Sequence, residues 1–267
     1  AASAIVAIAG LALSAVPAHA ADQGVTASTI KLGTTVPLTG IAGPGYAKVA
    51  PAMKAYFDYV NANGGVHGRQ IDFIIKDDRY LPQESVVKTN ELILKDKVFA
   101  IVGQLGTANN LAVNSKVRLG ARGVPSLFVS TGFSGFADKK KFPTMFPLFS
   151  SYAMEAKIMG QYIKDNFAGK KIGLIYQNDD FGADALKGFS AAGVKFDVSI
   201  PYVSGTQSSA TATTWIQKLA AAKVEVVYVF GVTTATAAAV GVAAVAGYKP
   251  QWIFGSVGAD ATTIVGQ

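Results

Sequence analysis

Two stretches of glycine and hydroxyl residues have the composition of a site that binds a small anion. The first, at residues 103–107, follows an apolar run at residues 99–102 and precedes a helical pattern, as when a buried parallel strand leads into a helix. The unpaired N–H groups and the dipole at the start of such a helix attract anions. The second stretch, at residues 130–134, follows another apolar run that begins at Val124. Together they predict a ligand site made of main chain and hydroxyl groups.

Side chains that commonly perform catalysis are scarce. Adjacent aspartates, at residues 77–78 and 179–180, follow two predicted strands. Neighbouring carboxylates on an extended chain point apart, so we expect turn and helix-capping roles rather than metal binding or acid–base catalysis. The chain has no cysteine and two histidines, one of them in a predicted leader, which excludes thiolate nucleophiles and multi-histidine metal sites. We therefore expect no enzyme activity, no cofactor and no metal.

The elements that must position these residues alternate between strands and helices. Apolar and β-branched runs predict the strands, and apolar residues at helical spacing predict the helices between them. The predicted strands lie near residues 29–37, 71–76, 99–102, 125–129, 172–177, 194–202, 224–230 and 252–255. Short connections between alternating elements imply parallel sheets with right-handed crossovers.

A proline-containing segment at residues 142–149 separates two such series. It predicts an extended connector, because proline disfavours helix in the residue before it. We place a lobe boundary there, with one lobe at residues 21–147 and a second at residues 148–267. After the boundary, Met154, Ile158 and Tyr162 recur at intervals of four and predict a helix. A cleft between two such lobes is a favoured ligand site.

The composition is that of a globular chain with a leader. Half of the 267 residues are apolar and 15% are charged, which is enough for two lobes of ordinary size. Lys and Arg exceed Asp and Glu by 24 to 17, but the basic residues are scattered and do not indicate a nucleic-acid partner. Residues 1–20 contain a short apolar run and end in Ala18-His19-Ala20, which predicts a signal peptide cleaved near Ala20.

Several motifs together point to a family. They are IKLG at residues 30–33, PLTG at 37–40, VNANGGVHGR at 60–69, DD at 77–78, GQLGT at 103–107 and DDFG at 179–182. From about Ala27 onwards the chain resembles the leucine/isoleucine/valine-type periplasmic solute-binding proteins. The resemblance implies the type I periplasmic binding fold, an α/β architecture of two Rossmann-like lobes with parallel sheets joined by a hinge. It also implies a periplasmic receptor of an ABC importer that closes on a small solute and delivers it to a membrane permease, without catalysis.

The resemblance also assigns residues to the solute site. Thr107 would hydrogen-bond the solute carboxylate beside Gly106, and Ser134 would be its counterpart in the second stretch. The other implied contacts are Gly132, Phe133, Phe181, Tyr46, Val232, Thr233 and Val257. Hydroxyls and main-chain N–H groups bind a carboxylate by charge-assisted hydrogen bonds without a buried countercharge. For Phe181, packing in the core is an equal alternative to covering the solute.

The sequence departs from the family pattern in two ways. Amino-acid-binding members commonly place an acid after the strand at residues 252–255 to receive the ammonium group, and this chain has Val257 there. Because a buried ammonium without a counterion is costly, either Asp260 or another acid replaces it or the solute has no ammonium. A branched-chain amino acid and an aromatic or aliphatic acid both remain open. The chain also ends earlier than family members, so we expect a fragment with an incomplete second lobe.

The sequence thus predicts a monomeric periplasmic receptor for a small amphipathic carboxylate or amino acid, with an ABC permease as its partner. Two alternatives remain. The first is an extracellular ligand-sensing module with the same fold, and the second is an exported α/β enzyme.

Overall fold

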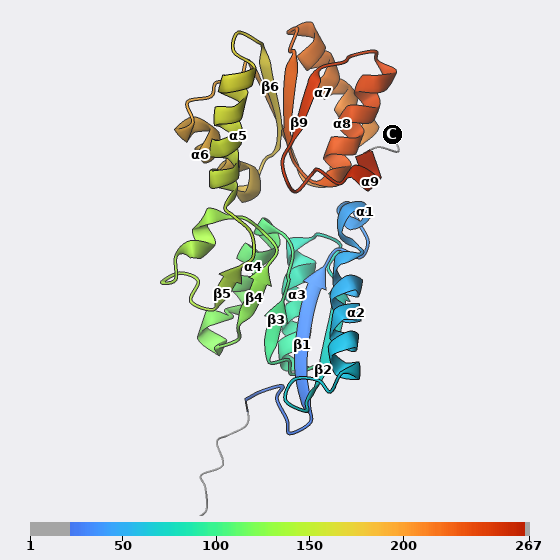
Figure 1. The fold of residues 1–267 in the computed structure, drawn as a ribbon, viewed down its shortest axis with the longest axis vertical. Coiled ribbons are helices and arrows are strands. Elements are labelled where there is room, and N and C mark those ends of the chain that lie inside the picture. The colour runs from blue at the N-terminus through green and yellow to red at the C-terminus, as the bar shows by residue number, and fades with distance from the viewer. Residues whose placement is uncertain (1–21, 265–267) are drawn as a thin grey trace, which may run out of the picture.

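The computed structural model describes residues 22–264, which form two lobes stacked along the long axis of the molecule (Figure 1). The first lobe lies at the bottom of that view and the second at the top. The predicted signal peptide at residues 1–20 lies outside the described residues. No helix within residues 22–264 is long and apolar enough to cross a membrane.

The first lobe is built on a five-stranded parallel sheet in the order β2-β1-β3-β4-β5. Its strands are β1 (Thr29–Val36), β2 (Gln70–Asp77), β3 (Ala100–Val102), β4 (Ser126–Val129) and β5 (Met145–Pro147). Its helices are α1 (Gly43–Tyr46), α2 (Val49–Ala62), α3 (Pro82–Leu94) and α4 (Thr107–Val117), with 3-10 turns at Gly120–Arg122 and Ser134–Ala137. Leu92 of α3 and Val113 of α4 pack with Ile101 of β3 in one buried cluster. This packing fixes the start of α4 at the end of β3.

Part of the predicted connector is a strand. Residues 145–147 form β5, which pairs with β4 as the edge of the first sheet. Pro147 is tolerated there because an edge strand leaves one row of backbone groups unpaired. The boundary that we place at residue 147 lies between β5 and the first helix of the second lobe.

The second lobe has a four-stranded parallel sheet in the order β7-β6-β8-β9. Its elements are α5 (Tyr152–Asn166), β6 (Ile172–Gln177), α6 (Asp180–Ala191), β7 (Val198–Tyr202), α7 (Ser209–Ala221), β8 (Val226–Phe230), α8 (Thr233–Val245), β9 (Gln251–Phe254) and α9 (Ala261–Ile264). Two buried clusters, one with α7 and α8 and one with α5 and α6, cover the two faces of this sheet. Every residue of the central strand β8 is therefore buried, which explains its unbroken apolar sequence. The two parallel sheets with their helices are the α/β lobes that the sequence predicts.

Helix α5 exists where it was predicted, but the apolar residues that predict it lie largely on its exposed side. Met154, Ile158 and Tyr162 are 57%, 61% and 46% exposed. The buried positions of the helix are Tyr152, Ala156, Gly160 and Ile163. The small residues among them let α6 and the loop after it approach α5 closely, so packing selects them over the larger apolar row.

Candidate functional site

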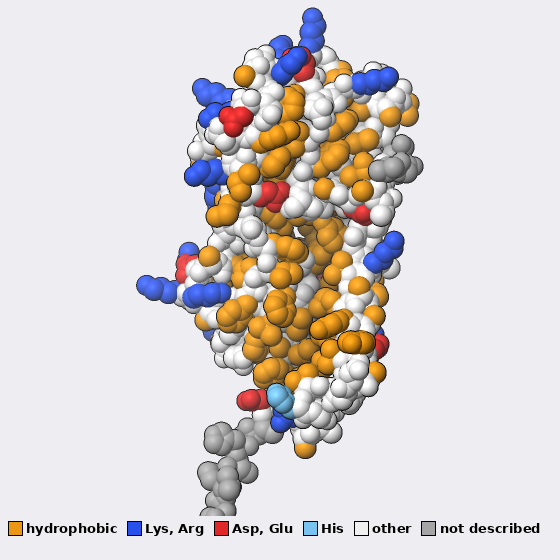
Figure 2. All heavy atoms as spheres, in the orientation of Figure 1, with side chains coloured by type: hydrophobic (Ala, Val, Ile, Leu, Met, Phe, Trp, Pro, Cys, Tyr) orange, Lys and Arg blue, Asp and Glu red, His pale blue; other side chains and the backbone are white. Residues whose placement is uncertain are grey.

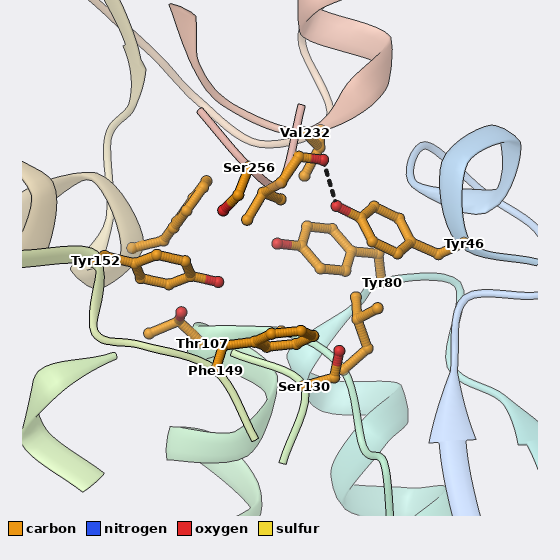
Figure 3. A pocket seen from close by; sticks show the side chains of 12 residues that line it. Tyr46, Tyr80, Thr107, Ser130, Phe149, Tyr152, Val232 and Ser256 are labelled. Atoms are coloured by element: carbon orange, nitrogen blue, oxygen red, sulfur yellow. Dashed lines mark hydrogen bonds between the residues drawn. The ribbon is translucent and has the colours of Figure 1, made fainter. Parts of the chain in front are cut away.

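A cavity of about 140 Å³ lies between the two lobes (Figure 3). The space-filling view shows a hollow at this level, bordered by hydrophobic side chains (Figure 2). On the same face, Lys and Arg side chains lie along the outer edges of the molecule. The residues that line the cavity are Tyr46, Tyr80, Leu105, Gly106, Thr107, Ser130, Phe149, Tyr152, Phe181, Val232, Ser256 and Val257.

The first predicted stretch supplies the start of α4 to the cavity. Gly106 precedes the helix and has φ +98°, a conformation that L side chains rarely adopt. Thr107 is the first residue of α4 and is only 2% exposed, and its hydroxyl lies 2.6 Å from that of Thr131. The N–H groups of the first helical turn have no partner within the helix. Together with the Thr107 hydroxyl, they make this side of the cavity the one best suited to a negative charge.

The second stretch reaches the cavity through Ser130, which is not among the predicted contacts. Its N–H donates to the carbonyl of Gln104 at 2.9 Å, and its own carbonyl accepts from the N–H of Gly106 at 3.3 Å. These bonds hold the ends of β3 and β4 side by side. The signal that could have found Ser130 is its position directly after β4, whereas Ser134 comes four residues later at the start of a 3-10 turn.

Two predicted contacts, Ser134 and Phe133, lie outside the cavity at a contact between the lobes. The N–H and the hydroxyl of Ser134 donate to the carboxylate of Asp184 in α6 at 2.8 and 2.5 Å. Asp184 is fully buried and also pairs with Lys187 at 3.2 Å. The ammonium of Lys187 lies 5.8 Å from the centre of the Phe133 ring. These residues therefore join the lobes instead of lining the cavity.

Gly132 and Thr233 also lie beside cavity residues and not among them. The carbonyl of Gly132 accepts from the N–H of Tyr152 at 2.7 Å, which fixes the start of α5. Thr233 begins α8 and packs against Gly45 of α1, so close that a Cβ on Gly45 would lie 3.0 Å from the Thr233 Cβ. Both residues therefore contact elements that carry cavity residues, Gly132 the start of α5 and Thr233 the helix α1.

The second lobe closes the cavity with Phe181, Val232 and Val257, which are among the predicted contacts. Phe181 packs edge-on against Tyr152, with ring centroids 4.8 Å apart, and is 2% exposed. Its roles in the core and in the cavity wall therefore coincide. Tyr46 reaches across from the first lobe, and its hydroxyl donates to the carbonyl of Val257 at 2.5 Å (Figure 3).

The aspartate pairs hold local structure, in the turn and capping roles that we expect for them. Asp179 caps α6 by accepting from the N–H of Phe181 at 3.0 Å, and burial raises its pKa. Asp77 accepts from the hydroxyl of Thr39 at 2.5 Å and from the N–H of Arg79 at 2.9 Å. Burial alone would raise the pKa of Asp77, but these hydrogen bonds outweigh it and lower that pKa. Within residues 22–264, no three acidic or histidine side chains gather in a way that could hold a metal.

Several aromatic and polar side chains that the sequence did not single out complete the cavity. Among them are Tyr80, Phe149, Tyr152 and Ser256. The hydroxyls of Tyr80 and Tyr152 point from opposite sides toward the middle of the cavity (Figure 3). Burial raises the pKa of Tyr152 to about 12 and also raises the pKa of Tyr80, so both remain neutral at physiological pH.

A family model described as periplasmic binding protein matches residues 29–266. The chain belongs to the periplasmic binding protein family. Proteins of this family are exported and bind solutes, and the family and its neighbours are not enzymes. The predicted resemblance to leucine/isoleucine/valine-type binding proteins and the predicted type I fold are both confirmed.

This periplasmic binding protein resembles relatives with different named ligands. It is 25% identical over 209 residues to an amino acid binding protein of Pseudomonas aeruginosa, covering 72% of this chain and 53% of that protein. It is 25% identical over 218 residues to the Leu/Ile/Val-binding protein homolog 3 of Brucella melitensis, covering 76% of this chain and 54% of that protein. It superimposes with a TM-score of 0.79 on a fatty acid ABC transporter substrate-binding protein from Thermomonospora curvata, at 25% identity over 91% of this chain and 61% of that one. The chain thus spans about half the length of the curated relatives that it matches.

The side chains that line the cavity of this periplasmic binding protein are neutral. None of the described residues that line it carries a charge. Asp260 is not among them, and its carboxylate accepts from the N–H of Thr262 at 3.0 Å at the start of α9. Glu155 accepts from the N–H and from the hydroxyl of Ser256, both at 2.7 Å. Both carboxylates therefore already have donors from the protein.

Proposed function

We propose that this protein is the solute receptor of an ABC importer and that its solute is a small amphipathic carboxylate without an ammonium group. The two lobes would enclose the solute in the cavity and present it to a membrane permease. The observation that carries the choice of solute is the absence of charge among the described residues that line the cavity.

The carboxylate would lie at the start of α4. Gly106, Thr107 and Ser130 line the cavity there, and Thr107 brings its hydroxyl to the first turn of α4, whose N–H groups have no partner within the helix. Charge-assisted hydrogen bonds of this kind stabilise an anion without a cationic side chain. A buried lysine or arginine is therefore not required here.

An ammonium group would find no comparable partner. Asp260, Glu155 and Asp179, three acids that lie near the cavity, are hydrogen-bonded to neighbouring protein groups. A buried unpaired cation costs several kcal/mol, because its desolvation is not offset. The apolar remainder of the solute would instead contact Leu105, Phe149 and Phe181. The name of the Thermomonospora curvata protein, a fatty acid receptor, agrees with such a solute.

A matched pair of solutes tests this proposal. Leucine and 4-methylpentanoate differ by the ammonium group, and benzoate adds an aromatic acid. We expect 4-methylpentanoate or benzoate to raise the unfolding temperature of the protein and leucine to leave it unchanged, because a ligand stabilises the state that it binds, by about 2.7 kcal/mol at 100 times its Kd. Stabilisation by leucine alone would mean that the solute carries an ammonium group. If none of the three solutes raised the unfolding temperature, the proposed solute class would be wrong.

Removing the Thr107 hydroxyl should weaken the binding of any acid found in this way. We expect Thr107→Ala to lower the affinity by about 1–3 kcal/mol, the range for a hydrogen bond to a charged group. Thr107→Ser keeps the hydroxyl and should retain most of the affinity. Isothermal titration calorimetry measures both, and equal Kd values for Thr107→Ala and the unaltered protein would remove Thr107 from the carboxylate site.

A further inference from the structure

Two successive residues beside the cavity have an uncommon backbone conformation. Arg79 and Tyr80 have φ +55° and +63°, in the left-handed region that residues other than glycine seldom enter. Such conformations persist where surrounding groups enforce them, and they cluster at functional sites. This turn follows the aspartate pair at residues 77–78, for which the sequence offered no role in binding.

The aspartate pair enforces the turn. Asp77 accepts from the N–H of Arg79 at 2.9 Å, and Asp78 accepts from the N–H of Tyr80 at 3.0 Å. The second oxygen of Asp78 accepts from the hydroxyl of Ser85 at 2.7 Å, which ties the turn to α3. Asp78 is fully buried, so these bonds are protected from water. The carboxylates thus act on the main chain and not on a solute.

The turn sends the Tyr80 side chain into the cavity. The ring lies close to Gly106, where a Cβ would come within 2.9 Å of a Tyr80 ring carbon. Its hydroxyl points toward the middle of the cavity (Figure 3), and the side chain is 8% exposed. Burial raises the pKa of the phenol, the charge of Asp179 in the second lobe raises it further, and a hydrogen bond from Gln177 opposes this shift. Tyr80 therefore stays protonated and lies next to the second lobe.

The chemistry of this hydroxyl indicates what it would recognise. A phenol hydroxyl donates one hydrogen bond, and that of Tyr80 faces the interior of the cavity (Figure 3). Val232 and Val257 of the second lobe also line the cavity, and their side chains offer no acceptor for this hydroxyl. A buried hydroxyl loses free energy unless it finds a hydrogen-bond partner. An oxygen atom on the solute would supply that partner.

We propose that Tyr80 is a specificity-determining residue that donates a hydrogen bond to a second oxygen of the solute, one that belongs to a hydroxyl or carbonyl group outside the carboxylate. Asp78 is the positioning residue that holds Tyr80 in place. This inference rests on the proposed function, because it assumes that the carboxylate lies at the start of α4.

Two pairs of acids that differ by one oxygen test the role of Tyr80. The pairs are 4-hydroxybenzoate with benzoate, and 5-hydroxypentanoate with pentanoate. We expect the unaltered protein to bind the hydroxylated member of at least one pair about tenfold more tightly, and Tyr80→Phe to reduce this preference to less than about twofold. Tyr56→Phe is the matched control, since Tyr56 is 64% exposed on α2, and should keep the preference. An unaltered protein that binds these acids without preference, or a Tyr80→Phe variant that keeps it, would overturn the proposal.

Asp78 is tested with and without a solute. Asp78→Asn keeps an acceptor for the Tyr80 N–H and should keep the preference, whereas Asp78→Ala should lose it. In the solute-free protein, the NMR signals of the Tyr80 ring, assigned with Tyr80→Phe, should shift in Asp78→Ala and stay in place in Asp78→Asn. Unchanged ring signals in a folded Asp78→Ala variant would overturn the positioning role. If none of the four acids bound the unaltered protein, both the proposed function and the role of Tyr80 would be wrong. If the acids bound without preference, only the role of Tyr80 would be wrong.

Discussion

Replacing Gly106 by alanine should abolish measurable solute binding. The backbone at Gly106 has φ +98°, which alanine adopts only with strain. A Cβ at this position would also lie 2.6 Å from the side-chain oxygen of Asn109 and 2.9 Å from the ring of Tyr80. Relief of these contacts requires the turn before α4 or the Tyr80 ring to move, and both form the cavity wall. We expect the affinity to fall at least 100-fold, about 2.7 kcal/mol.

Calorimetry with an acid that binds the unaltered protein measures this effect, and circular dichroism shows whether the variant is folded. Gly43→Ala is the matched control. A Cβ on Gly43 would lie 3.4 Å from the nearest atom, the carbonyl oxygen of Leu38, which is ordinary contact. That variant should bind as the unaltered protein does. A folded Gly106→Ala variant with normal affinity would show that the start of α4 does not hold the solute.

The second large effect is expected from Gly182→Ala, and it should appear in stability. Gly182 lies in the first turn of α6, where a Cβ would press into the carbonyl group of Gln177 and lie 2.9 Å from the Tyr176 ring. Alanine favours helix over glycine by about 1 kcal/mol. The clash outweighs this gain because a backbone carbonyl in β6 cannot rotate away. We expect a net loss of roughly 1–3 kcal/mol in the unfolding free energy.

Denaturant unfolding followed by circular dichroism measures that loss. Ala183→Ser, at an exposed position of the same helix, is the control and should change the unfolding free energy by less than about 0.5 kcal/mol. Because α6 also carries Phe181, the Gly182→Ala variant should bind solute more weakly even at temperatures where it is folded. A variant as stable as the unaltered protein would mean that α6 can shift along β6 at little cost.

The alternation of elements and the first binding stretch could be predicted because local sequence determines them. A strand that is covered on both faces, such as β8, has an unbroken apolar sequence and can be recognised by it. The turn at Gly106 could be predicted because a glycine between a strand and a helix commonly marks a tight turn with a positive φ. The start of α4 and its place at the end of β3 follow from these two patterns.

Other parts of the site depend on contacts that local sequence does not encode. Ser130 and Ser134 are both hydroxyl residues after the same strand, and the contact of Ser134 with Asp184, 50 residues away, decides which of them faces the cavity. Tyr80 enters the cavity through a left-handed turn that sequence patterns for strands and helices do not include. The exposed row on α5, with Met154 and Ile158, had the spacing of a buried face, but α6 packs on the smaller residues beside it.

The order of the strands has a consequence for biosynthesis. Every strand of the first sheet, β1 to β5, precedes every strand of the second, β6 to β9, in the chain. The earlier sheet needs no hydrogen bond from later residues, so it can be completed while the ribosome is still adding the rest. Domains that fold as units during synthesis expose less apolar surface to aggregation at any moment. A released chain that ends shortly after β5 should therefore already yield a protease-resistant product.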